Sequence, residues 1–146
     1  MNLTEYTKET LRGLPGVVVV VENLRDDAEA AGLRAAELQS DVESRLTQGG
    51  IRVLPHSEWR ITPGRPWLYV SVNTISYLAS HFFSIDVQLK QDVSLPRIPS
   101  IVTSSATWEM GSIGFATTIG MPSKIREAVG NYLESFITDY QSVNGG

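Results

Sequence analysis

The sequence contains no cysteine and only two histidines, His56 and His81. A chain without cysteine has no disulfide, no thiolate nucleophile and no Cys-ligated zinc site. Two histidines need further ligands to hold a metal ion, and no ligand spacing supplies them. We therefore predict no metal site, no cofactor and no catalytic residues.

Positive charge and long apolar runs are also scarce. Lys and Arg number 12 against 16 Asp and Glu, so the net charge is −4, and we predict no nucleic-acid partner. The longest apolar run, Val17 to Val21, is far shorter than the roughly 20 residues of a membrane-spanning helix, which predicts no membrane span. The first 13 residues lack the pattern of a secretion signal, so we expect either a cytoplasmic protein or the mature part of an exported one.

The motifs of common enzyme classes are missing as well. The sequence has no G-x-S-x-G nucleophile elbow and neither of the glycine-rich patterns that cradle nucleotide phosphates. The acidic residues Glu22, Asp26, Asp27 and Glu29 cluster after the first apolar run, but without the spacing of a calcium-binding loop. We interpret them as a solvated acidic connection.

The clearest pattern in the chain is an alternation between Phe82 and Leu95. Phe83, Ile85, Val87 and Leu89 share one parity, and polar residues fill most of the other. Successive side chains of a strand point to opposite faces, so this stretch predicts a long strand with one dry and one wet face. Gln91 is the single polar break on the dry side.

Two helical stripes are the predicted cover for that dry face. The first helix is predicted from Arg34 to Gln48, and the second from Pro122 to about Val143. The further strands are predicted at 17–21, 51–54, 67–75 and 101–110. The segment 55–66 is interpreted as a surface loop or single helical turn. The segment 111–120 is interpreted as loose, with the last strand continuing through Phe115 if its glycines only kink it.

Together these elements predict an α+β fold. We expect a mixed sheet of about five strands, in the order β-α-β-β-β-β-α along the chain, with two helices packed on one face. The chain length suits one domain, so 1–146 is predicted as a single domain with 1–13 as a lead-in segment and 144–146 as a frayed tail.

Aromatic side chains on the wet face provide the main functional hint. Trp67, Tyr69 and Phe82 fall on the polar parity of their strands, beside Asn73, and Trp59 lies in the preceding loop. An open face that carries these five residues is a predicted binding surface for a peptide, a sugar or another subunit. An unpaired sheet edge is the other predicted route to a protein partner or to self-association.

Two alternative functions remain open at this point. A small hydrolase would use His56 and Glu58, with His81 as the remaining histidine of the group. A small-molecule carrier would need a pocket between helix and sheet, where Leu133 and Phe136 instead predict a filled interior.

Several segments resemble a known group of proteins. These are GVVVVVENL, GLRAAELQSDVESRLTQGGIRVL, PWLYVSVNT, FSIDVQLKQDVSLPR, TWEMGSIG and IREAVGNYLESFITDYQSVN. Over roughly Leu14 to Asn144 the chain is similar to a family of uncharacterised bacterial proteins that are commonly exported. The order of elements also resembles the TolB amino-terminal domain and related envelope lipoproteins. The resemblance implies the fold and a periplasmic setting, but no reaction. We therefore expect a non-catalytic binding or assembly module of the bacterial envelope.

Overall fold

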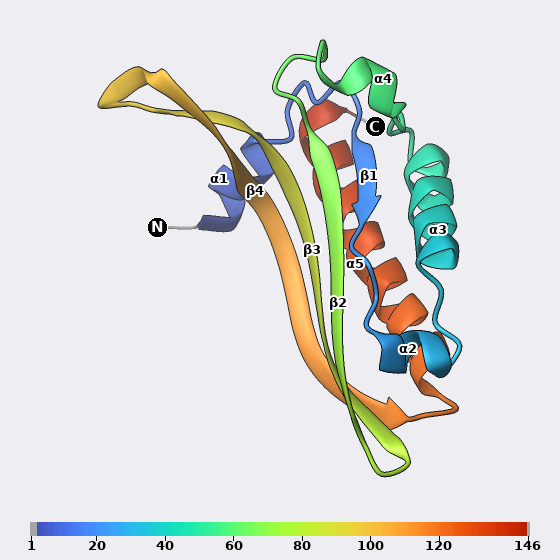
Figure 1. The fold of residues 1–146 in the computed structure, drawn as a ribbon. Helices are drawn as coiled ribbons and strands as arrows, with labels where there is room; N and C mark the ends of the chain where they lie inside the picture. The colour runs from blue at the N-terminus through green and yellow to red at the C-terminus, as the bar shows by residue number, and fades with distance from the viewer. Residues whose placement is uncertain (1–2, 146) are drawn as a thin grey trace.

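The computed structural model describes residues 3–145 and shows an α+β fold with one mixed four-stranded sheet (Figure 1). The strands follow one another across the sheet as β1 (Val18–Val21), β2 (Trp67–Tyr77), β3 (Ser80–Leu95) and β4 (Ile98–Thr117). β1 and β2 are parallel, whereas β2, β3 and β4 form an antiparallel meander. The helices of the described residues are α1 (Leu3–Glu9), α2 (Asp26–Ala30), α3 (Ala35–Gln48), α4 (His56–Trp59) and α5 (Met121–Asn144).

The two helices predicted as a cover, α3 and α5, lie side by side on the same side of the sheet (Figure 1). Ile85, Val87 and Leu89 of β3 are fully buried in the core formed with these helices. Phe136 of α5 is also fully buried, and Trp108 of β4 meets it edge-on with ring centroids 5.0 Å apart. The alternating pattern of β3 and the helical stripes therefore meet in one apolar layer, as expected.

The prediction of five strands was wrong, because the segment 51–54 does not form one. Only Val53 makes an isolated parallel bridge, to Val17. Ile51 and Leu54 bury their side chains in the core, so burial rather than strand pairing explains this apolar segment. Gly50, with a φ of 82°, and Pro55 bound the segment on either side.

The last strand is longer than its predicted core of 101–110, because β4 continues without interruption to Thr117. The glycines that suggested a loose segment instead allow close approach to β3. A Cβ on Gly111 would lie 2.8 Å from the carbonyl oxygen of Ile85, and one on Gly114 would lie 2.8 Å from the ring of Phe83. Glycine inside a strand can mark such a close approach as well as a break.

Three further segments carry structure that the sequence indicated only weakly or not at all. The lead-in contains α1 and places Leu11 in the core, and the acidic connection after β1 contains α2. The loop 55–66 contains the single turn α4, as the second of its two predicted forms. At the other end of the chain the Asn144 side chain donates a hydrogen bond to the Leu11 carbonyl (2.9 Å).

Candidate functional site

The sheet face opposite α3 and α5 is called the open face here. Trp67, Tyr69 and Asn73 of β2 lie on it, and the strand register places Lys90, Gln88 and Ser84 of β3 beside them. In Figure 1 the helices α3 and α5 lie on the other side of the sheet. His56 and Trp59 of α4 border the open face at its Trp67 end. Four of the five predicted binding residues therefore lie on the open face, with Phe82 of β3 at the opposite end from Trp67, and α4 supplies the fifth, Trp59.

One apolar hollow lies at the end of the open face near the β2–β3 turn. It has a volume of about 470 Å³, and its lining residues come from β2, β3 and β4: Asn73, Ile75, Phe82, Phe83, Ser84, Ile113, Gly114 and Phe115. Ile113 is 86% exposed and Phe82 is 52% exposed. The rings of Phe82 and Phe115 lie 5.9 Å apart, so the hollow has an aromatic wall.

A second hollow, of about 340 Å³, lies at the opposite end of the open face. Its lining comes from β1, from the loop that contains α4, and from β2, β3 and β4. The residues are Val18, Val20, His56, Trp59, Arg65, Trp67, Asp92 and Ser104. The loop is held in place by the Trp59 indole, which donates to the Arg65 carbonyl (2.9 Å), and by an Arg65–Asp92 ion pair (2.8 Å). The loop thus forms a side wall beside Trp67.

A band of paired polar groups separates the two hollows. Lys90 Nζ lies 5.0 Å from the Trp67 ring centroid and 4.8 Å from that of Tyr69. Ser71 donates to Glu22 (2.7 Å), and Gln88 donates to Glu109 (2.9 Å). Lys90 thus contacts both aromatic rings, and the other polar groups are hydrogen-bonded in pairs.

The band also shifts two pKa values. Hydrogen bonds from the Tyr69 and Ser71 hydroxyls, helped by the charge of Lys90, hold the pKa of Glu22 below its ordinary value. The same bond to Glu22, together with partial burial, raises the pKa of Tyr69. Because the folded pKa of Glu22 is lowered, the stability it contributes is present above the ordinary Glu pKa and is lost as the pH falls through the folded pKa.

We expect Tyr69→Phe to raise the pKa of Glu22 toward its ordinary value, because it removes the hydrogen bond that lowers this pKa most. A carboxyl-carbon NMR titration of both proteins measures this change. Tyr77→Phe is the matched control, because Tyr77 is an exposed tyrosine at the end of the same strand. An identical Glu22 titration in wild type and Tyr69→Phe would contradict the assignment.

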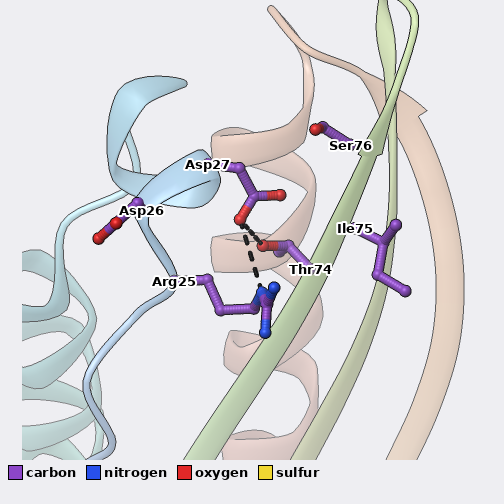
Figure 2. Close-up of a pocket in the computed structure, with 6 residues that line it drawn as sticks. All are labelled: Arg25, Asp26, Asp27, Thr74, Ile75 and Ser76. Atoms are coloured by element: carbon purple, nitrogen blue, oxygen red, sulfur yellow. Dashed lines mark hydrogen bonds and ion pairs between the residues drawn. The ribbon is translucent and has the colours of Figure 1, made fainter.

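A third hollow, of about 560 Å³, lies between α2 and β2 and is lined by Arg25, Asp26, Asp27, Thr74, Ile75 and Ser76 (Figure 2). Asp27 accepts a hydrogen bond from the Thr74 hydroxyl (2.9 Å), and its Oδ1 lies 3.8 Å from Arg25 Nε. The acidic connection is therefore only partly solvated, because Asp27 points at the sheet.

Asp27 also approaches the buried side chain of His81. Its Oδ2 lies 3.6 Å from His81 Nε2, and His81 Nδ1 lies 3.2 Å from the Thr118 hydroxyl. A hydroxyl, an imidazole and a carboxylate in this order are used in nucleophilic hydrolysis only when they open onto substrate space. Neither His81 nor Thr118 lines the neighbouring hollow, so we interpret the chain of contacts as a tie between α2 and the sheet.

The residues of the alternative hydrolase are not brought together. His56 lines the hollow at the Trp67 end, whereas His81 pairs with Ser76 at the opposite end of β2. Nine residues of strand separate Trp67 from Ser76, which is roughly 30 Å. Glu58 is already engaged by Arg52 (2.7 Å). Within residues 3–145 no group of three or more His, Asp or Glu side chains could hold a metal ion.

Two residues that line the first hollow, Ile113 and Phe115, were not predicted as binding residues from the sequence. Both lie on the same parity as Glu109 in β4, so the alternation that revealed β3 would have placed them on the open face. Lys90 was also missed as the residue that bridges Trp67 and Tyr69, because this contact depends on the pairing register between β2 and β3.

Comparison with known proteins gives no family. No family model matches the chain, and no curated protein matches it. None of the helices in the described part of the chain is both long enough and apolar enough to cross a membrane.

Proposed function

We propose that this protein is a non-catalytic binding module that holds an extended polypeptide segment of a protein partner on its open face. The observation that carries the proposal is the pair of apolar hollows at opposite ends of this face, with a polar band between them. Exposed aromatic residues gathered in hollows are the usual anchors of protein interfaces.

The spacing of the hollows suits an extended segment. Trp67 marks one hollow and Ile75 the other, eight residues apart along β2. At about 3.3 Å per residue this separation is roughly 26 Å, which eight or nine residues of an extended peptide would span. Large apolar side chains at both ends of such a peptide would fill the hollows.

The polar band supports recognition rather than chemistry. Glu22, Ser71, Gln88 and Glu109 hydrogen-bond to one another in pairs across neighbouring segments. A general acid has to carry a proton near neutral pH, and the lowered pKa of Glu22, caused by the hydrogen bonds from Tyr69 and Ser71, argues against that role. The paired groups would instead fix the position of the polar middle of the bound segment.

The bacterial envelope is part of the proposal and rests on the resemblance to a commonly exported family. Fractionation of source cells with an antibody against this chain tests it, and recovery in the periplasmic fraction is the expected result.

A selection of random 12-residue peptides on the immobilised protein tests the binding function. We expect the selected peptides to share two large apolar positions about eight residues apart. In titrations of a selected peptide, Trp67→Ala and Phe82→Ala should each weaken binding by roughly tenfold or more, as truncation of an anchor does.

The matched control is Ile61→Ala, because Ile61 is 83% exposed but lines neither hollow. This variant should bind the peptide like the wild type. Selected peptides that bind Trp67→Ala and Phe82→Ala with wild-type affinity would refute the proposal, provided that both variants show the wild-type circular dichroism spectrum.

A further inference from the structure

The outer edge of the sheet is formed by β4, which pairs only with β3 among the strands of the described chain (Figure 1). The Thr118 amide donates to the Ala79 carbonyl (2.9 Å), so these two opposite residues form a hydrogen-bonded pair. In an antiparallel ladder, hydrogen-bonded and non-hydrogen-bonded pairs alternate along the strand. By that alternation, Glu109, Gly111, Ile113 and Phe115 direct their backbone groups away from β3. This stretch of β4 therefore presents a row of peptide groups that a further strand would match.

Within its own sequence the same stretch lacks the usual protection of an edge, although a charge reaches it from α5, where Lys124 donates to the Phe115 carbonyl (2.8 Å). Between Met110 and Thr117 there is neither a charged residue nor a proline. Ile113 is 86% exposed and Phe115 is 61% exposed. Natural edge strands are normally shielded by charges, prolines or covering elements, so an apolar edge of this length is a pairing surface.

The side chains along this edge are complementary to themselves. If two copies of β4 pair antiparallel about a two-fold axis at Ser112, Ile113 of one copy lies opposite Gly111 of the other. On the other face of the sheet, Met110 then lies opposite Gly114 of the second copy. Ile113 and Met110 thus each face a glycine, which carries no side chain.

The charges fit the same register. Lys124 Nζ donates to the Phe115 carbonyl (2.8 Å) and lies 5.7 Å from the Phe115 ring centroid, so its charge sits at the outer edge of β4. With the axis at Ser112, Phe115 lies opposite Glu109 of the second copy. Lys124 of each copy then faces Glu109 of the other, which gives two opposite-charge contacts. If the axis passed through Ile113 instead, the Ile113 side chains of the two copies would face each other. Glu109 would then lie opposite Thr117 of the second copy, farther from Lys124.

We propose that two copies of this chain associate through β4, antiparallel about Ser112, to form a continuous eight-stranded sheet. The proposal rests on the backbone edge of β4, although Ile113 also lines the first hollow and Glu109 belongs to the polar band of the open face. Association of two copies is therefore measured in the absence of any peptide, so that its failure is distinguishable from a failure of the binding function proposed above. A dimer built in this way presents two open faces side by side.

Disulfide trapping is the sharpest test, because the chain has no cysteine of its own. In the proposed dimer Ser112 of one copy lies directly opposite Ser112 of the other. The two form a non-hydrogen-bonded pair with Cα atoms about 4.5 Å apart, which is within the range of a disulfide. Ser112→Cys should therefore form a covalent dimer rapidly under mild oxidation. Ser94→Cys, another exposed strand serine, is the control and should not. Equal rates for the two variants would overturn the proposal.

Sedimentation equilibrium of the full chain gives a second readout. Wild type should approach twice the 16.0 kDa chain mass as its concentration rises. Ile113→Arg, which changes an exposed side chain, should weaken association by roughly tenfold or more. Glu109→Lys should weaken it as well, and addition of Lys124→Glu should restore it. A wild type that stays monomeric at millimolar concentration, or a dimer that none of these changes affects, would overturn the proposal.

Discussion

Replacing Phe136 with alanine is expected to lower the free energy of unfolding by about 3–5 kcal/mol. Phe136 is fully buried at the centre of the layer between α5 and the sheet, and it packs edge-on against Trp108. The substitution removes a large apolar side chain and leaves a cavity that the neighbouring helix and strands cannot fill. Urea unfolding followed by circular dichroism measures the effect.

Phe115→Ala is the matched control, because it makes the same chemical change at a ring that is 61% exposed on the open face. It should cost about 1 kcal/mol or less, since surface substitutions have small effects. If Phe136→Ala were no more destabilising than Phe115→Ala, the helical layer would not be the main source of stability.

Replacing Gly16 with alanine is expected to cost about 2–4 kcal/mol, the sum of a strained backbone and a steric clash. Gly16 precedes β1 with a φ of +151°, and a Cβ there would lie 2.6 Å from the Arg52 carbonyl oxygen. That carbonyl accepts the Val17 amide (3.0 Å), so the clash would push the segment 51–54 away from the start of β1. Thermal and urea unfolding both report the loss.

Gly13→Ala separates the two contributions. Gly13 also has a positive φ, of +73°, but a Cβ there would meet nothing within 4 Å. The control should cost about 1 kcal/mol from backbone strain alone. Equal losses at Gly13 and Gly16 would show that contact with the Arg52 carbonyl contributes nothing.

The regular part of the fold follows from the sequence because burial imposes a period. The alternation of Phe83, Ile85, Val87 and Leu89 fixes which face of β3 meets the helices, and the structure buries all four. The stripes of α3 and α5 are predicted for the same reason. The segment 51–54 has the apolar pattern of a strand because Ile51 and Leu54 are as buried as strand residues, although they make no ladder.

The candidate site was harder to predict, because it depends on register as well as parity. Parity alone put Trp67, Tyr69, Asn73 and Phe82 on one face, and the structure places them there. Which of them meet across strands is set by the turn between β2 and β3, and no periodicity in the sequence specifies that turn. The register separates Phe82 from Trp67 and divides the aromatic residues between two hollows.

The far end of β3 and β4 extends beyond the helices as a two-stranded ribbon (Figure 1). Its base is clamped where the Asp92 amide donates to the Gly64 carbonyl (2.8 Å) and the Trp67 indole donates to Ser104 (3.2 Å). Beyond these contacts the ribbon continues for six residues of β4, from Thr103 to Ile98, which is a length of roughly 20 Å. The tip of the ribbon therefore lies far from its nearest contacts with the rest of the chain, so a rotation of about 10° at the base would displace it by about 3–4 Å.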